Sequence, residues 1–299
     1  MKKMIQDQRS ALRWLISSII LIAITSISAE TLTGCNPKPK EDAASTNESS
    51  GENGTAMNAS EGAEKVDKQA DKLLKEMSDY LTAMKQFSYT SKGIIEIVGD
   101  DKTKDKVTYN SEVFIKRPNK MRVNVKNEDR NAAVYYDGKK FTVLGKNANM
   151  YAQADAPPTL DAALDSAREK FVLDPPGADM LYTNAYDGLM EQVTDGKVLK
   201  EENINGKAAN HLAFKSKEVD WEIWIQKGES PVPLRYKIIS KNEPERPEMT
   251  VDFSDWKPGT GNAFADQQFV LTPPAKSRKI PFMTLGSGPT ASTTNPKKK

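Results

Sequence analysis

The sequence is poor in the residues that most often perform chemistry in proteins. Its 299 residues include one cysteine, Cys35, and one histidine, His211. A zinc site needs several cysteine or histidine ligands, which this chain does not have. A Ser-His-Asp triad would depend on His211, but no Gly-x-Ser-x-Gly motif accompanies it. We therefore expect no metal site, no cofactor and no enzymatic activity, with a hydrolase of unrecognised type as the least favoured alternative.

An excess of charge of either sign is also missing. The chain has 43 Lys and Arg against 41 Asp and Glu. Residues 1–34 hold four of the basic and two of the acidic residues, so the rest of the chain has 39 of each. The charges are interspersed, whereas nucleic-acid binding needs a concentrated basic face. We expect no nucleic-acid partner.

Long apolar runs are absent except near the N-terminus. Four basic residues precede an apolar stretch at residues 15–27. This stretch is too short to span a bilayer as a permanent helix, and it is typical of an export signal. Residues 32–35, Leu-Thr-Gly-Cys, follow it and resemble a lipobox, the motif at which bacterial lipoproteins are cleaved before the cysteine and acylated.

Cleavage at this motif would make residues 1–34 a lipoprotein signal peptide and Cys35 the first residue of the mature chain. Two or three acyl chains on Cys35 would anchor the protein stably to a membrane. The alternative is cleavage after Ala29, which would release a soluble protein. Asn36 occupies the place where an Asp often retains lipoproteins in the inner membrane. We expect a protein of the cell envelope that faces the periplasm, at the outer rather than the inner membrane.

Large apolar residues are scarce in two further segments. Residues 36–62 contain Met57 as their one large apolar side chain, so residues 35–62 are predicted to be a disordered tether. Residues 284–299 are rich in Gly, Ser, Thr, Pro and Lys and are predicted to be a disordered tail. The remaining residues, 63–283, have the length of a single domain.

Hydrophobic periodicity in this domain predicts an α+β fold. Apolar residues recur every three or four positions over residues 66–84, which predicts a helix. From residue 87 the period is two, with hairpin signals at Asp137-Gly138 and Asn205-Gly206. A helical pattern at residues 160–171 interrupts the strands, and a short helix is predicted near residues 187–192. We expect an antiparallel meander of about ten strands.

This order of elements resembles the LolA/LolB lipoprotein-carrier fold, and more closely a family of uncharacterised predicted periplasmic proteins in that superfamily. The resemblance implies an antiparallel, incompletely closed β-barrel (half-barrel) covered by helices. It spans about residues 65–275 and contains no catalytic signature. The stretches that carry it are Tyr151-Ala152, residues 156–161, residues 178–182, residues 204–206, His211-Leu212, Trp224-Ile225 and residues 231–236.

The resemblance also implies an apolar concavity that holds acyl chains or another hydrophobic ligand. A packed core would need the same apolar residues, so the alternative is an interaction or sensor module that binds another envelope protein and has no cavity. Trp221 and Trp224 are separated by an odd number of residues and should lie on opposite faces of their strand. The candidate cavity residues are Tyr89, Ile95, Tyr109, Val113, Val123, Val125, Leu212, Phe214, Trp221 and Ile223.

Overall fold

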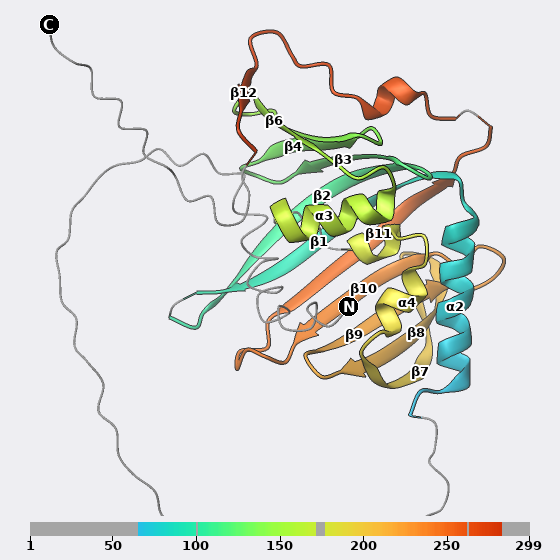
Figure 1. Cartoon of the computed structure of the whole chain (residues 1–299). Helices are drawn as coiled ribbons and strands as arrows, with labels where there is room; N and C mark the ends of the chain where they lie inside the picture. Colours follow the sequence, from blue (N-terminus) through green and yellow to red (C-terminus); the bar gives the residue numbers. More distant parts are fainter. Residues whose placement is uncertain (1–64, 100, 172–176, 262, 283–299) are drawn as a thin grey trace, which may run out of the picture. The chain divides into compact units, whose positions relative to one another are not determined.

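The computed structural model describes residues 65–99, 101–171, 177–261 and 263–282 (Figure 1). The expected signal peptide, the lipidation site Cys35, the expected tether and the C-terminal tail lie outside the described residues. The described residues all fall within the expected domain, residues 63–283.

The described residues form one sheet, which does not close into a barrel. Along the sheet the strand order is β12-β6-β5-β4-β3-β2-β1-β11-β10-β9-β8-β7, so β12 and β7 are the two edges. The fold is therefore α+β, with an antiparallel, unclosed sheet, as expected. The strands are β1 (Gln86–Val98), β2 (Lys104–Lys116), β3 (Lys120–Lys126), β4 (Asn131–Tyr136), β5 (Lys140–Gly145), β6 (Met150–Asp155), β7 (Val193–Ile204), β8 (Lys207–Ser216), β9 (Val219–Gln226), β10 (Pro233–Ser240), β11 (Glu248–Pro258) and β12 (Arg278–Ile280).

Two details of the expected meander were wrong. The described residues contain 12 strands rather than about ten, and β12 pairs with β6 in parallel, with Arg278 opposite Met150. A strand of three residues is too short to produce a period-two signal, so the sequence gives no warning of it. The other neighbouring pairs of strands are antiparallel, as expected.

Helices cover one face of this sheet (Figure 1). Helix α2 (Lys68–Ala83) begins after Asp67, whose carboxylate accepts a hydrogen bond from the Gln69 N–H at 2.6 Å. Helix α3 (Leu160–Phe171) begins after Thr159, whose hydroxyl accepts from the Ala162 N–H at 3.4 Å. The short elements η1 (Ala178–Leu181) and α4 (Ala185–Met190) follow, and η2 (Asp266–Phe269) lies near the C-terminal end of the described chain.

Both predicted hairpin turns are confirmed. Asp137 accepts hydrogen bonds from the N–H groups of Lys139 at 2.9 Å and Lys140 at 2.8 Å, between β4 and β5. Asn205 and Gly206 have φ angles of 50° and 84° and join β7 to β8. Both residues therefore adopt the left-handed region, as a two-residue hairpin turn of type I′ requires.

Side chains alternate between two faces, which we call the helix-covered face and the outer face. Tyr109, Val113 and Val123 belong to the helix-covered face and join the hydrophobic core. Their neighbours in sequence, such as Asn110 and Asn124, belong to the outer face. Cross-strand register preserves this division, since Val113 lies opposite both Tyr89 on β1 and Val123 on β3.

Candidate functional site

All ten candidate cavity residues lie on the helix-covered face, in two groups. One group comes from β1, β2 and β3, and the other from β8 and β9, where Leu212 lies opposite Ile223 and Phe214 opposite Trp221. Nine of them are at most 5 % exposed, and Val125 is half-buried. The structure brings them into one hydrophobic core. A ligand contact for these residues stays a prediction.

Strands β10 and β11 join the two groups and supply core residues that the list of candidates missed. Val251 lies opposite Gly93 on β1 and opposite Tyr236 on β10, and Tyr236 in turn lies opposite Ile223. Phe253 packs edge-on against Tyr89, with ring centroids 5.5 Å apart. The alternation in residues 249–256 was a sufficient signal for these positions, because it matches that of the other strands.

Tyr109 introduces a polar atom into the middle of this apolar face. Its ring lies over Gly93, where an added Cβ would come within 1.9 Å of Tyr109 Cζ. Its hydroxyl oxygen is buried and has no hydrogen-bond partner among the residues that the structure describes. Burial, followed by the proximity of Tyr89, raises the pKa of Tyr109 well above its ordinary value. The hydroxyl therefore stays protonated and is able to donate a hydrogen bond.

A second polar feature lies beside Tyr109. Ser91 and Ser111 are direct cross-strand neighbours, and their hydroxyl oxygens are 3.1 Å apart. Both residues are buried. Buried hydroxyl groups are nearly always hydrogen-bonded. The hydroxyls of Ser91 and Ser111 satisfy each other, whereas the Tyr109 hydroxyl is an exception to this rule and requires an explanation.

The face is closed by what we call the helical cover, namely α3, η1 and α4. The cover is tied to itself by polar bonds. The Tyr182 hydroxyl donates to Asp165 at 2.7 Å, the Thr183 N–H donates to Asp161 at 3.0 Å, and Arg168 pairs with the carboxylate of Asp179 at 3.3 Å. These bonds join α3 to the η1 segment and make the cover one structural layer.

The cover reaches the sheet mainly through apolar side chains, three of which are alanines, Ala163, Ala167 and Ala185. It is also bonded elsewhere, since Arg117, which follows β2, donates to the Tyr182 carbonyl at 3.2 Å, and the Tyr186 N–H of α4 donates to the Ser78 hydroxyl of α2 at 3.0 Å. Further polar links to the sheet lie at the start of α3. The Leu160 N–H donates to the carbonyl of Pro118 at 2.9 Å, and the Tyr136 hydroxyl donates to the carbonyl of Pro157 at 2.6 Å.

His211 lies on the outer face between two carboxylates. It is 6 % exposed, its Nδ1 is 3.0 Å from a Glu202 carboxylate oxygen, and its Nε2 is 2.8 Å from one of Glu222. Its ring stacks on Trp224 with centroids 3.9 Å apart. Hydrogen bonds from Lys200 and from His211 lower the pKa of Glu202, so this carboxylate is ionised near neutral pH.

Trp221 and Trp224 lie on opposite faces, as their odd separation predicts. Trp221 belongs to the helix-covered face and stacks on Phe214 at 4.2 Å. Trp224 is not under a helix but is covered by His211 and by Arg235, whose guanidinium carbon is 5.7 Å from the ring centroid. Tryptophan on an outer face can be buried by such stacking alone.

Two further properties concern the described residues alone. Within them, no group of three His, Cys, Asp or Glu residues is arranged to hold a metal ion. None of their helices has both the length and the apolar character that crossing a membrane would require.

No curated protein matches the sequence significantly. Solved structures that resemble the fold include an uncharacterised conserved protein from Thermus thermophilus, with 13% identity, a TM-score of 0.43, and 72% of this chain and 99% of that chain covered. LprF from Mycobacterium bovis has 11% identity and a TM-score of 0.41 over 68% of this chain and 99% of that one. A LolA superfamily protein from Nitrosomonas europaea has 13% identity and a TM-score of 0.37 over 68% and 97%. Residues 70–283 match the model of the predicted periplasmic proteins DUF2092, and the chain belongs to that family.

Proposed function

We propose that this protein is a lipid-anchored lipoprotein of the cell envelope whose helix-covered face binds a hydrophobic ligand, such as an acyl chain. Its role would be that of a carrier, an acceptor or a chaperone, without enzymatic activity. The observation that carries the proposal is the construction of α3, which is joined to the η1 segment by polar bonds but, beyond its first residue, rests on the sheet through apolar contacts.

Apolar contacts are non-directional, so an acyl chain can replace them without leaving polar groups unpaired. The bonds within the cover, such as that between Tyr182 and Asp165, are unaffected when α3 and η1 move together. The links of Leu160 and Tyr136 lie at the start of α3, where they can serve as the fixed end of such a movement. Opening the cover would break the hydrogen bond from Arg117 to Tyr182, while α4 can stay bonded to α2 through Tyr186.

Tyr109 supports the same proposal. A buried hydroxyl without a partner is unfavourable by about 1–3 kcal/mol in a packed core. The carbonyl oxygen of an ester, an amide or a carboxylic acid at the end of an acyl chain would accept its hydrogen bond. The polar end of the ligand would then lie near Tyr109, and its chain would lie along the valines of β2 and β3.

Membership of a family of predicted periplasmic proteins agrees with an exported chain. Within this proposal, Cys35 carries the acyl groups that hold the protein at the membrane, and Asn36 favours the outer membrane. The mass of the N-terminal peptide of the purified protein tests the anchor. We expect a diacylated or triacylated Cys35, and no acyl mass in a Cys35→Ser variant; an unmodified N-terminus after Ala29 would contradict it.

Ligand binding is tested with the full chain carrying Cys35→Ser, which is purified from the periplasm without detergent. Extraction and mass spectrometry should find about one acyl-containing ligand per chain. The same variant, after removal of that ligand, should bind a fluorescent fatty acid and release it to unlabelled lipid. A ligand-free, stable protein that does not bind the fluorescent fatty acid would contradict a hydrophobic carrier.

The close packing of the candidate residues favours a second candidate function. Nine of the ten are at most 5 % exposed, as in an ordinary core. In that case the protein is a protein-interaction or sensor module of the envelope. Cross-linking in intact cells would then capture one partner protein reproducibly, and the lipid extract would be empty.

A further inference from the structure

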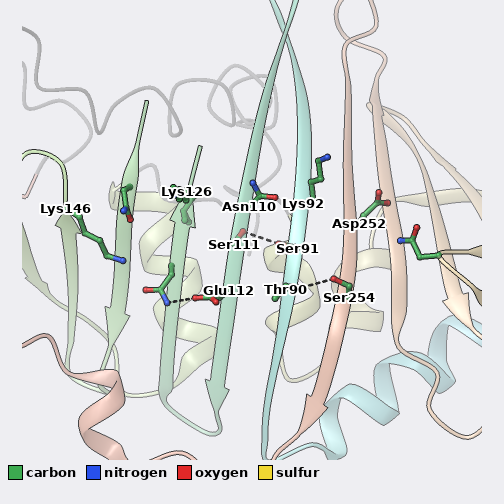
Figure 2. Close-up of a pocket in the computed structure, with 14 residues that line it drawn as sticks. Thr90, Ser91, Lys92, Asn110, Ser111, Glu112, Lys126, Lys146, Asp252 and Ser254 are labelled. Carbon is green, nitrogen blue, oxygen red and sulfur yellow. Dashed lines mark hydrogen bonds between the residues drawn. The ribbon is translucent and has the colours of Figure 1, made fainter. Parts of the chain in front are cut away.

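A polar hollow lies on the outer face, opposite the helical cover (Figure 2). It has a volume of about 760 Å³, within the range of small-molecule sites, roughly 300–1,000 Å³. Strands β11, β1, β2 and β3 form its floor, and Asn205 of the β7–β8 turn also lines it. Ser91, Ser111 and Val125, which belong to the helix-covered face, also border it, but the charged and amide side chains that its strands supply all come from the outer face.

The sheet register places lysine and asparagine alternately in one row across the hollow. Lys92 lies opposite Asn110, Asn110 opposite Lys126, and Lys126 opposite Asn131. The Lys146 N–H then donates to the carbonyl of Asn131 at 2.8 Å. Direct cross-strand neighbours have Cβ atoms about 4.5–5.5 Å apart, so the row presents three ammonium groups with two carboxamides between them. We call it the Lys/Asn row.

The three lysines of the row have no ion-pair partner among the described residues. The two carboxylates of the hollow are already engaged, since Asp252 accepts two hydrogen bonds from Arg235 and Glu112 accepts one from Asn124 at 3.1 Å. Elsewhere on the outer face some lysines are paired with carboxylates, as in Lys104–Glu96 at 3.0 Å and Lys237–Glu248 at 2.9 Å, and others, such as Lys215, have no ion pair among the described residues. What distinguishes the row is that its lysines line one hollow.

Protection of a sheet edge does not account for the Lys/Asn row. Exposed lysines on edge strands prevent edge-to-edge association. The row instead crosses β1, β2, β3 and β4, which are paired on both sides in the interior of the sheet. Successive lysines of the row are separated by an asparagine, which puts them about 10 Å apart, so they repel one another only weakly while all three can reach one extended anionic ligand.

The chemistry of the row specifies the ligand. Ammonium groups bind carboxylates or phosphates, and a carboxamide offers both a donor and an acceptor, which suits the hydroxyl and N-acetyl groups of sugars. The hydroxyls of Thr90 and Ser254 also line the hollow, but they are hydrogen-bonded to each other at 2.7 Å and to Asp255. No aromatic ring is among the described residues that line the hollow, so the base stacking of single-stranded nucleic acid has no platform there.

We propose that the hollow on the outer face binds an anionic oligosaccharide through the Lys/Asn row. In the envelope such a ligand has two sources, a glycan whose charge is carboxylate, as in peptidoglycan fragments, and a glycan whose charge is phosphate. The lysines bind the anionic groups, and Asn110 and Asn131 bind the neighbouring hydroxyl or N-acetyl groups.

The test is calorimetric titration of the full chain carrying Cys35→Ser with three probes. The probes are a disaccharide-tetrapeptide fragment of peptidoglycan, a phosphorylated oligosaccharide and neutral chitotetraose. We expect one of the two anionic probes to bind, more weakly as salt increases, and chitotetraose to bind at least about tenfold more weakly. Which anionic probe binds identifies the source. Failure of both, or equal binding of chitotetraose, would overturn the proposal.

Matched variants locate the site. Replacing Lys92, Lys126 and Lys146 together by Gln should weaken the anionic probe by at least about tenfold. Replacing the exposed residues Lys139, Lys215 and Lys217 by Gln changes the net charge equally, and should change affinity less than about twofold. Thermal unfolding checks that both triple variants are folded. Equal weakening by the two triple variants would mean a general effect of charge and would overturn the assignment to this row.

Asn110→Ala gives a finer test, because it leaves the charge unchanged. It should weaken the anionic probe about threefold to tenfold through loss of the carboxamide. Unchanged affinity in this variant, together with a full effect of the lysine variants, would overturn the role of the carboxamides in recognising the glycan.

Discussion

The helix-covered face and the outer face of this sheet are made from alternate residues of the same strands, yet different forces stabilise them. On β8, Leu212 and Phe214 are buried in the hydrophobic core, while His211, on the other side of the same strand, is held by two carboxylates. The first face depends on burial of apolar surface, which is large for each residue and insensitive to salt. The second depends on directional pairs, which are individually smaller and respond to pH and salt.

The comparison also separates the two proposed binding sites. The helix-covered face is closed by a layer of helices, and a ligand enters it only by displacing apolar contacts. The outer face holds an open hollow whose lysines are unpaired among the described residues. Successive residues of a strand point to opposite faces of the sheet, so the residues of one face can change without changing those of the other. A sheet that packs a hydrophobic core on one face can therefore bind a polar ligand on its other face.

The largest effect should follow from removing a large ring on the helix-covered face. Phe214→Ala leaves a cavity beside Trp221 and should reduce the free energy of unfolding by about 3–5 kcal/mol in denaturant titrations. Its neighbour Lys215 is exposed on the outer face, and Lys215→Ala should change the free energy of unfolding by less than about 0.5 kcal/mol. Similar losses in the two variants would mean that the faces do not differ as described.

A smaller loss is expected at the best-connected residue of the outer face. His211→Leu takes the shared hydrogen-bond partner from Glu202 and Glu222, and should reduce the free energy of unfolding by about 1–3 kcal/mol. Adding Glu222→Gln to this variant should restore part of the loss, because one unpaired charge is removed. The absence of any loss in His211→Leu would show that the two hydrogen bonds contribute nothing to stability.

The outer face should also give the protein a pH dependence. Burial raises the pKa of Glu96, but hydrogen bonds from Lys104 and the Glu248 N–H, and then the charges of Lys104 and Lys106, lower it more. Its pKa in the folded state therefore lies below the ordinary value of 4.5. Stability from this carboxylate is fully present above that ordinary value, and it is lost as pH falls through the folded-state pKa.

Glu96→Gln should accordingly reduce the free energy of unfolding by about 1 kcal/mol at neutral pH, and by less as the solution becomes acidic. Denaturant titrations of both proteins at about pH 7 and about pH 3 measure the difference. Phe214→Ala serves as the comparison, since its loss should be similar at both pH values. A loss from Glu96→Gln that grows on acidification would have the wrong sign for a lowered pKa.

The smallest effect on stability is expected at Tyr109. Tyr109→Phe removes a hydroxyl that has no partner, so the free energy of unfolding should stay unchanged or rise by up to about 1 kcal/mol. Tyr136→Phe is the matched control on the same face, because its hydroxyl donates to Pro157, and it should lose about 1 kcal/mol. A ligand carbonyl at Tyr109 would appear as less acyl ligand extracted from Tyr109→Phe. A loss of stability as large as that of Tyr136→Phe would show that the Tyr109 hydroxyl has a partner.

Sequence periodicity was sufficient to predict most helices and strands, but not which strands and side chains contact one another. The helices at residues 68–83 and 160–171 and the turns at Asp137 and Asn205 were all expected, because their signals are local. β12 was missed, because its three residues are specified by pairing with β6 rather than by a local pattern. The single histidine was expected to be structural, which stays a prediction, and its two carboxylate partners were not named, since they come from two different strands.

At the candidate site, too, the sequence predicted local features but not the contacts between strands. The ten candidate residues were named as a cavity implied by the family resemblance, and it is the structure that places all of them on one face of the sheet. The sequence contained no sign that Tyr109 would lie over Gly93 without a hydrogen-bond partner, because these residues are neighbours only through the register of β1 and β2.

By itself, the sequence determined the class of the fold, the alternation of apolar and polar residues along each strand, and the family to which the chain belongs. The tertiary structure alone decided which strands are neighbours and in which register. Irregularities in pairing, such as those near Ser88 and near Pro233, shift that register by amounts that no count along the chain provides. The Lys/Asn row exists for this reason. Its residues come from separate stretches between positions 92 and 146, and the hydrogen-bonded register of the sheet brings them into one line.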